Sequence, residues 1–570
     1  KSFRRERSVE STFCIMIFTS SDERRSESGR RTVRGGVRSR AVRNWVDTFT
    51  LPDLLSRAAE RWPDRDCLVL PSGRATFAEL DDAATRVARC LAALGIGRDD
   101  HVGLVLPNGR AFVEFLCGAA LLGAWVVPIN SRYKAHELAH VIADADLKVL
   151  VTSDAIDDVV DFAALVAEAL HDLASAADPA ALHLAGAPAL RSVVLLGVKQ
   201  VPGMVDEARF DAGAELVDSR IIATARSRVR LRDVAIMMYT SGTTAMPKGC
   251  PLSHEALVRT AIEAGRTRFE LTEVDRVWDP LPMFHMSFVL PFIACLDAGA
   301  ALLSMEHFEP GQALAYLEAE RATVSFASFP TITQALLTHP DYDAARMSFR
   351  LVNNVAPPDV LRSMQAAMPF ATQISAYGLT EAGGVVAFGR SSDTIEQRVT
   401  TSGQPFRGIE VVARDLTTNA VLAPGESGEL CIRGYCLFEG YYKDPAKNAE
   451  AFDDDGFLHT GDLGFVDEDG YVAYRGRVKD MLKVGGENVA AVEIESFLST
   501  HPAVLLAQVV SAPDAKYGEV PAAFVQLRPG TSATADELIE HCRGRIASFK
   551  VPRFVRFVED WPMSATKIQK

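Results

Sequence analysis

The sequence lacks an excess of positive charge. Its 570 residues include 60 lysines and arginines against 74 aspartates and glutamates, which gives a formal net charge of −14. A field of this sign repels nucleic acids and anionic membrane surfaces, so a general nucleic-acid-binding or membrane-surface protein is disfavoured. An anionic substrate would therefore have to meet a local group of basic residues.

Paired cysteines and long apolar runs are also missing. The nine cysteines are scattered without a C-x-x-C pair, which argues against a disulfide framework or zinc knuckle and favours a reducing cytoplasm. The most apolar stretches, 115–129 and 286–305, are too short or are interrupted by Asp297, whereas a spanning helix needs roughly 20 consecutive apolar residues. We expect a cytoplasmic protein with no transmembrane segment.

The N-terminal end differs from the rest in composition. Residues 1–44 contain eleven arginines, five acidic residues and much serine. The acidic residues and the lack of an amphipathic period argue against a transit peptide. We interpret residues 1–47 as a disordered basic extension or an artefact and exclude them from the fold.

From about Thr48, helix-like and strand-like segments alternate, which predicts an α/β architecture with mostly parallel sheets. The segment 403–442 carries short strand-like runs between Gly and Pro turns, typical of a small barrel or antiparallel sheet. Beyond residue 477 the pattern becomes a compact α+β unit, with a helix expected over 535–546. The predicted fold is a large N-terminal body, 48–476, of two α/β sheets plus a small β-barrel, and a small mobile C-terminal α+β domain, 477–570.

The strongest local motif follows the apolar run 234–238. Residues 239–249 read YTSGTTAMPKG, in which small hydroxyl residues and glycine let backbone amides approach phosphate oxygens and Lys248 adds charge. It is not a Walker A loop, because Lys248 is followed by Gly-Cys and not by Ser or Thr. The segment predicts a phosphate-binding loop.

Further motifs follow in a fixed order: PMFH at 282–285, YGLTE at 377–381, TGD at 460–462, GRVKD at 476–480 and Lys567 near the end. Together with the phosphate loop they resemble the adenylate-forming enzymes, which include acyl-CoA and aryl-CoA synthetases, luciferases and the adenylation domains of peptide synthetases. The resemblance spans roughly residues 51–570. It implies a ligase that uses ATP, Mg²⁺ and CoA.

The resemblance also implies roles for individual residues. Glu381 would hold Mg²⁺, which prefers carboxylate and phosphate oxygens. Lys567 would approach the substrate carboxylate and the α-phosphate, where a fixed charge stabilises the transition state. Lys248, Thr380, Glu381 and Lys567 are thus the expected catalytic residues. The expected nucleotide-binding residues are Thr240, Ser241, Gly242, Thr243, Thr244, Lys248, Tyr377, Gly378, Thr380, Asp462 and Arg477.

The remaining implied sites concern the acid, the thiol and domain rotation. Lys479 occupies the hinge position between the two domains. Lys483, Gly485 and Gly486 belong to a loop expected to approach the thiol channel after rotation, where glycines allow close backbone contact. The acyl pocket is expected to include Phe284, His285, Asn354, Val355 and Ala356.

Four positions depart from the family pattern. Thr566 stands where Gly usually precedes the C-terminal lysine, and Ala245 replaces a usual Gly in the phosphate loop. Ser375 and Ala491 replace a frequent Asn and Pro. None of these changes removes a charged catalytic group, although Ala disfavours the positive φ that Gly allows.

The expected reaction has two halves. A carboxylate attacks the α-phosphate of ATP to give an acyl adenylate and pyrophosphate, and a thiol then displaces AMP. The acid is expected to be fatty or aryl, with small polar acids left open, and the thiol to be CoA. A stand-alone adenylation enzyme that loads a carrier protein, a luciferase-like oxygenase and a non-catalytic adenylate-binding protein stay open, as does a homodimer.

A rival motif lies at His136-Glu137-Leu138-Ala139-His140. H-E-x-x-H places two imidazoles on one face of a helix with a possible base, as in zinc hydrolases. No clear third ligand follows nearby in the sequence. We expect a surface helix with two solvated histidines.

Overall fold

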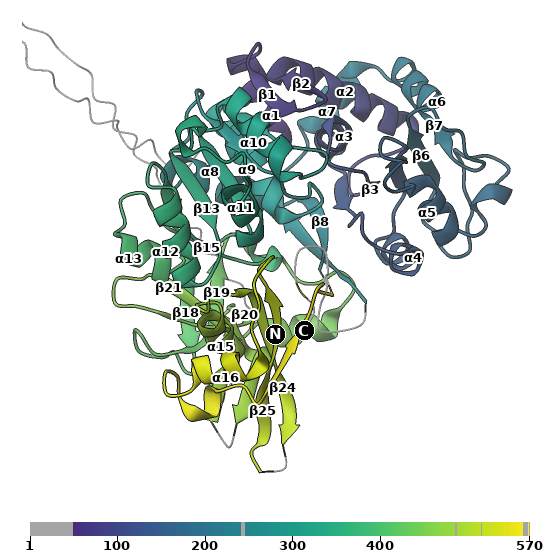
Figure 1. Cartoon of the computed structure of the whole chain (residues 1–570). Helices are drawn as coiled ribbons and strands as arrows, with labels where there is room; N and C mark the ends of the chain where they lie inside the picture. The colour runs from purple at the N-terminus through teal and green to yellow at the C-terminus, as the bar shows by residue number, and fades with distance from the viewer. Residues whose placement is uncertain (1–48, 241–245, 485–486, 515, 563–567, 569–570) are drawn as a thin grey trace, which may run out of the picture. The chain divides into compact units, whose positions relative to one another are not determined.

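The computed structural model describes residues 49–240, 246–484, 487–514, 516–562 and 568 (Figure 1). Seven of the predicted site residues lie outside this part of the chain: Ser241, Gly242, Thr243, Thr244, Gly485, Gly486 and Lys567. The sequence departures Ala245 and Thr566 lie outside it too.

The first large sheet has the strand order β7-β6-β5-β3-β4-β8-β9. Its pairs are parallel except for the final hairpin β8–β9. Parallel strands buried on both faces read as continuous apolar runs, and β5 and β6 are buried at every residue. The strands are β3 His101–Val105, β4 Trp125–Pro128, β5 Val149–Ser153, β6 Ser192–Leu196, β7 Val205–Asp206, β8 Val234–Thr240 and β9 Lys248–Ser253.

The second large sheet has the order β14-β13-β12-β10-β11-β1-β2 and is parallel except for the β1–β2 hairpin. The predicted pair of α/β sheets is therefore confirmed. Its strands are β1 Asp66–Leu70, β2 Gly73–Thr76, β10 Arg276–Trp278, β11 Ala301–Leu303, β12 Val324–Ser328, β13 Leu351–Asn354 and β14 Thr372–Ile374.

The helices of these layers begin and end at recognisable signals. Helix α2 starts with a capping box in which Thr76 and Glu79 satisfy each other's backbone amides, and the chain leaves it through Gly95 at φ +78°. The helices up to the third sheet are α1 Leu51–Arg61, α2 Phe77–Ala93, α3 Arg110–Leu121, α4 Ala135–Asp144, α5 Phe162–Ala169, α6 Glu207–Ala212, α7 Ser219–Arg226, α8 His254–Thr267, α9 Met286–Ala298, α10 Pro310–Glu320, α11 Pro330–Leu337 and α12 Pro358–Ala367.

Two antiparallel sheets correspond to the predicted small β-barrel. The first has the order β15-β16-β17 and the second β18-β19-β20-β21. Their strands are β15 Ala376–Tyr377, β16 Ala387–Phe388, β17 Gln404–Pro405, β18 Ile409–Arg414, β19 Gly428–Gly434, β20 Leu458–Val466 and β21 Val472–Arg477; helices α13 Ile395–Thr400 and α14 Pro445–Ala451 accompany them.

The C-terminal α+β unit has a sheet of order β23-β22-β25-β24, with β26 beside β25. Helix α16 ends at Cys542, four residues earlier than predicted, because Gly544 adopts φ +74° and turns the chain away. The elements are β22 Met481–Val484, β23 Glu487–Ala490, α15 Ala491–Leu498, β24 Val504–Asp514, β25 Gly518–Leu527, α16 Ala535–Cys542 and β26 Phe554–Phe557.

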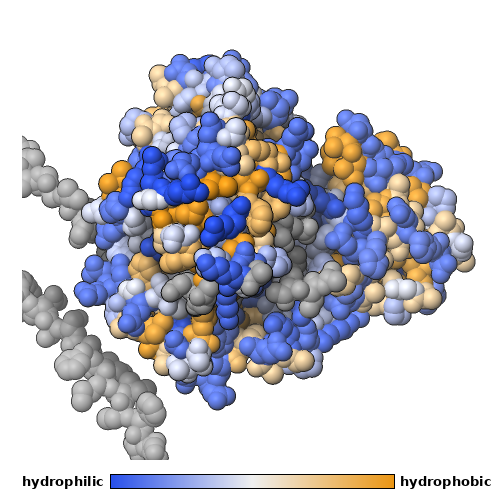
Figure 2. Space-filling model, turned by 60° about the horizontal axis from the view of Figure 1, so that its bottom comes forward, coloured by the Kyte–Doolittle hydropathy of each residue, from blue (hydrophilic) through white to orange (hydrophobic). Residues whose placement is uncertain are grey.

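None of the helices within the described ranges is long and apolar enough to cross a membrane. Hydrophilic and hydrophobic residues are interspersed over the face shown in Figure 2.

A buried histidine joins the first helix to α8. The Leu51 N–H donates to Nδ1 of His254 at 3.1 Å, and only 1% of His254 is exposed. Because burial disfavours the imidazolium, the pKa of His254 falls to about 4 from its ordinary 6.5. The histidine is therefore neutral in the folded protein at pH 5, while it is protonated in the unfolded chain.

This difference predicts a loss of stability in mild acid. The unfolded chain binds a proton between pH 6.5 and 4 that the folded protein does not, so stability decreases as pH falls through this window. We expect His254 to contribute about 2 kcal/mol of destabilisation between pH 8 and pH 5. Urea midpoints of wild type and His254→Gln across this range test it: equal pH slopes in the two proteins would contradict the assignment.

Candidate functional site

One cavity of about 1600 Å³ receives residues from both large sheets and from the antiparallel sheets. Of the predicted site residues that the structure describes, the cavity wall includes Thr240, Lys248, Phe284, His285, Val355, Ala356, Tyr377, Gly378, Thr380, Glu381, Asp462, Arg477 and Lys479. Motifs separated by more than 200 residues of sequence thus meet in one space.

The two ends of the predicted phosphate loop are fixed by the β8–β9 hairpin. Thr240 pairs with Lys248 in antiparallel register, so both ends of the loop leave the sheet side by side. The Lys248 ammonium lies 2.8 Å from the Asp444 carboxylate, which also caps helix α14 through the Lys447 N–H. The hydrogen bond from Lys248 lowers the pKa of Asp444. Lys248 is therefore a fixed cation at the cavity wall.

Glu381 lies on the short 3₁₀ turn Thr380–Ala382. Gly383 follows at φ +70°, a conformation that glycine adopts without strain, and ends the turn. The Tyr441 hydroxyl donates to Oε1 of Glu381 at 2.9 Å, while the Lys248 ammonium lies 5.8 Å from the centre of the same Tyr441 ring. Burial, and then Glu381, raise the pKa of Tyr441. Tyr441 thus contacts both the anionic Glu381 and the cationic Lys248.

The donor set at Glu381 fits Mg²⁺. This ion usually binds proteins through one or two carboxylates and completes its shell with waters and substrate phosphates. Glu381 supplies one such carboxylate, and Thr380 stands next to it on the cavity wall.

Asp462 is the centre of a second polar group. Strands β20 and β21 pair Asp462 with Arg477, whose Nε lies 2.7 Å from Oδ1, and the Tyr377 hydroxyl donates to Oδ2 at 2.9 Å. Only 2% of Asp462 is exposed. Burial lowers the pKa of Arg477, but Asp462, together with Tyr474, Tyr377 and Glu381, offsets this and leaves the pKa above its ordinary value. The carboxylate is therefore held by one hydrogen bond, from Tyr377, and one ion pair, with Arg477.

Tyr377 is more buried than a solvent-facing ring would be. It is 6% exposed and stacks on Tyr474, with ring centres 6.0 Å apart and planes inclined by 22°. Burial, followed by Asp462, raises the pKa of its hydroxyl well above the ordinary value. Tyr474 is the exposed ring of this pair, at 39% exposure. Because both tyrosines line the cavity, an adenine base bound there would contact Tyr474 as well as Tyr377.

One residue of the predicted acyl pocket lies outside the cavity wall. Asn354 is fully buried and does not line the cavity, since its amide bonds to Thr333 and Gln373. Asn353 lines the cavity in its place and donates to Ser328. Successive side chains of strand β13 point to opposite faces of the sheet, so Asn353 faces the cavity while Asn354 faces the core.

The residues at the end of PMFH enter the cavity at the start of α9. Phe284 and His285 line it, and His285 caps the helix by accepting from the Ser287 N–H at 3.2 Å. This capping role fixes the ring orientation.

The predicted hinge and thiol-channel residues lie on successive elements. Lys479 lies on the turn Val478–Asp480 and lines the cavity. Lys483 is exposed on β22, where its N–H donates to Glu519, and it does not line the cavity.

The H-E-x-x-H motif does not assemble a metal site. On α4, the Glu137 carboxylate accepts from the Lys134 N–H, and Nε2 of His140 lies 3.1 Å from the Pro247 carbonyl oxygen. Within the described part of the chain, the one group of three potential metal ligands is instead Glu429, Cys431 and His459. The zinc-hydrolase hypothesis has no support at this helix.

Sequence reasoning missed several residues that line the cavity or bond to its wall: Tyr441, Asp444, Tyr474, Glu429 and His459. Only Asp444 carried a local signal, because Asp before Pro445 is typical of a helix N-terminus. The others reach the cavity through strand pairing and loop packing that no short motif encodes.

Comparison with known proteins places the chain in a family. The model described as AMP-binding enzyme matches residues 55–442, and the model described as AMP-binding enzyme C-terminal domain matches residues 493–567. The chain is 37% identical over 529 residues to the "Putative acyl-CoA synthetase YngI" of Bacillus subtilis, covering 91% of this chain and 96% of that one. It is 31% identical to the human "Medium-chain acyl-CoA ligase ACSF2, mitochondrial", covering 92% and 87%.

Solved structures agree. The crystal structure of the anthranilate CoA ligase AuaEII in complex with anthranoyl-AMP superposes with a TM-score of 0.79 at 26% identity, covering 91% of this chain and 96% of that chain. The resemblance inferred from the motifs is confirmed, and the chain belongs to the AMP-binding enzyme family.

Proposed function

We propose that this cavity carries out both halves of the reaction of an AMP-forming acyl-CoA synthetase. ATP and CoA are its cosubstrates, and a carboxylic acid is activated as its acyl adenylate before transfer to CoA. The observation that carries the proposal is the convergence of Lys248, Glu381 and Asp462 on one cavity that also receives the apolar Phe284.

In the first half, the polar wall holds ATP. Asp462 offers carboxylate oxygens to the ribose hydroxyls, and Arg477 holds that carboxylate in place. The Lys248 ammonium faces the departing pyrophosphate, since a preorganised cation stabilises charge as it develops. Glu381 with Thr380 would hold Mg²⁺, whose charge screens the phosphates. Lys567, outside the described residues, is proposed to orient the attacking carboxylate.

In the second half, the thiol displaces AMP. We propose residues 48–476 as the body and 477–570 as the lid, with rotation about Lys479 and with Lys483, Gly485 and Gly486 near the thiol. Lys483 lies on β22, which follows the turn that contains Lys479, so a change of backbone angles at Lys479 would move it.

The acid is proposed to be fatty or aryl. The acyl side of the cavity is formed by Phe284, Val355 and Ala356, with the Asn353 amide and His285 as polar groups. Relatives include proteins named for a medium-chain acyl group and for anthranilate, so both classes belong in the test. A carrier protein as thiol acceptor is the second candidate. A cytoplasmic location and a homodimer stay predictions, and one relative's name includes the word mitochondrial.

Release of AMP tests the function. The full chain is incubated with ATP, Mg²⁺, CoA and a panel of fatty, aryl and short polar acids. We expect AMP formation that requires both an acid and CoA. Lys248→Met removes the cation but keeps the side chain's length, and we expect it to lower kcat by about 10²-fold.

The matched control is Lys443→Met, since Lys443 is exposed and pairs with Asp146 away from the cavity wall. It should keep wild-type rates. Acid-dependent exchange of pyrophosphate into ATP without CoA turnover would favour a carrier protein, and a lack of AMP with every acid would contradict the proposal.

A further inference from the structure

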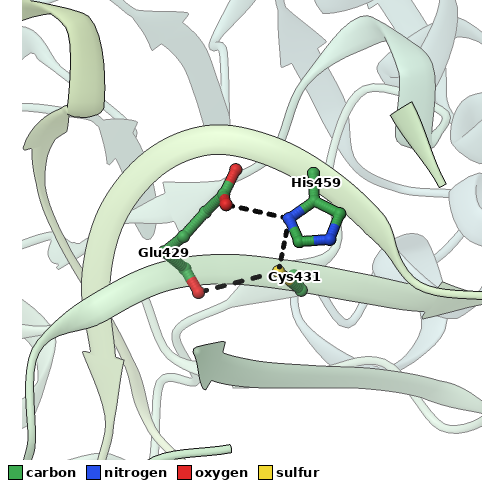
Figure 3. A group of neighbouring side chains, drawn as sticks. All are labelled: Glu429, Cys431 and His459. Carbon is green, nitrogen blue, oxygen red and sulfur yellow. Dashed lines mark hydrogen bonds and ion pairs between the residues drawn. The ribbon is translucent and has the colours of Figure 1, made fainter. Parts of the chain in front are cut away.

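A group of metal-type ligands lies beside the nucleotide wall, and none of its members has a role in the proposed reaction. Glu429 and Cys431 belong to β19 and His459 to β20 (Figure 3). Nδ1 of His459 lies 2.8 Å from Oε2 of Glu429 and 3.5 Å from Sγ of Cys431. One ligand atom from each residue lies within 4.8 Å of the others.

These separations are close to those around a tetrahedral ion. With Zn–S near 2.3 Å and Zn–N or Zn–O near 2.0–2.1 Å, neighbouring ligand atoms lie about 3.3–3.6 Å apart. The N–S pair already has this separation, and the N–O pair would lengthen by about half an ångström. A thiol, an imidazole and a carboxylate are also the three ligand types that Zn²⁺ uses.

The scaffold fixes the ligands. Cys431 and His459 are opposite each other in the antiparallel β19–β20 register. The register shifts between Glu429 and Cys431, and Oε1 of Glu429 accepts from the Gly461 N–H at 2.8 Å. That hydrogen bond orients the carboxylate and leaves Oε2 directed at His459. Metal ligands usually have such a hydrogen-bond partner, which fixes their orientation.

An entry path exists as well. Glu429 and His459 line the cavity, whereas Cys431 is fully buried. We propose that Glu429, Cys431 and His459 form a three-ligand Zn²⁺ site with its fourth position open to the cavity. The site shares no ligand with the Mg²⁺ position at Glu381.

The test uses Co²⁺ as a spectroscopic probe on the full chain, without nucleotide or acid. We expect one Co²⁺ per chain, an absorption band from thiolate-to-cobalt charge transfer, and displacement by Zn²⁺. Cys431→Ala should abolish the band, and His459→Gln should weaken binding by at least about tenfold. Because no substrate is present, the result does not depend on the proposed enzymatic activity.

Cys436→Ala is the matched control, since Cys436 is also fully buried, five residues along the chain. His136→Gln controls for the H-E-x-x-H helix. Both should keep the band, and urea midpoints confirm that every variant is folded. A missing band in folded wild type, or a band that persists in Cys431→Ala, would overturn the proposal.

Discussion

Glu381→Gln is expected to lower kcat for AMP formation by about 10²-fold or more. The substitution keeps the shape of the side chain and removes its negative charge. Since Mg²⁺ is held by few protein carboxylates and depends on hard anionic oxygens, the variant should need a higher Mg²⁺ concentration for half-maximal rate. Initial rates over a Mg²⁺ titration measure both effects.

Tyr441→Phe separates the charge of Glu381 from its orientation. It removes the 2.9 Å hydrogen bond to Glu381 but keeps the carboxylate and the ring beside Lys248. We expect a change below about tenfold, the scale of one hydrogen bond. A Glu381→Gln protein with wild-type rate and wild-type Mg²⁺ dependence would rule out the metal role.

The second large effect is expected for Asp462→Asn. The carboxylate is 2% exposed and is held by Arg477 and Tyr377. The amide keeps one acceptor oxygen and loses the charge, so we expect the KM for ATP to rise by about 10–100-fold with a smaller change in kcat. Loss of the charged partner should also lower the free energy of unfolding by about 2 kcal/mol.

Tyr377→Phe provides the control for this group. It removes the hydrogen bond to Asp462 and leaves the Asp462–Arg477 ion pair intact, so the expected loss of stability is about 1 kcal/mol. Steady-state kinetics with ATP as the varied substrate, together with urea unfolding, distinguish binding from folding. An unchanged KM for ATP in folded Asp462→Asn would remove Asp462 from the nucleotide site.

The order of short motifs determined the family. YTSGTTAMPKG, YGLTE, TGD and GRVKD each need particular residue types at fixed spacing, and that information is local. The two α/β sheets were predicted for a related reason, because buried parallel strands and amphipathic helices leave periodic apolar patterns in sequence.

The end of one predicted helix differs in the structure. Helix α16 stops at Cys542 although its apolar pattern continues to Ile546, because Gly544 takes a left-handed conformation. The finding that Asn353 lines the cavity and the predicted Asn354 does not also depends on tertiary structure. A strand's two faces differ by a single position, and only its packing between layers decides which face meets the cavity.

The partners of the site residues were decided by tertiary structure alone. Tyr441 reaches Glu381 across 60 positions, and Asp444 reaches Lys248 across 196. Glu429, Cys431 and His459 gather because β19 and β20 pair with a shifted register. The sequence by itself thus determined the residue types that carry the chemistry, because each motif is local. Tertiary structure decided which distant side chains contact those residues, because strand pairing joins segments that are far apart in the sequence.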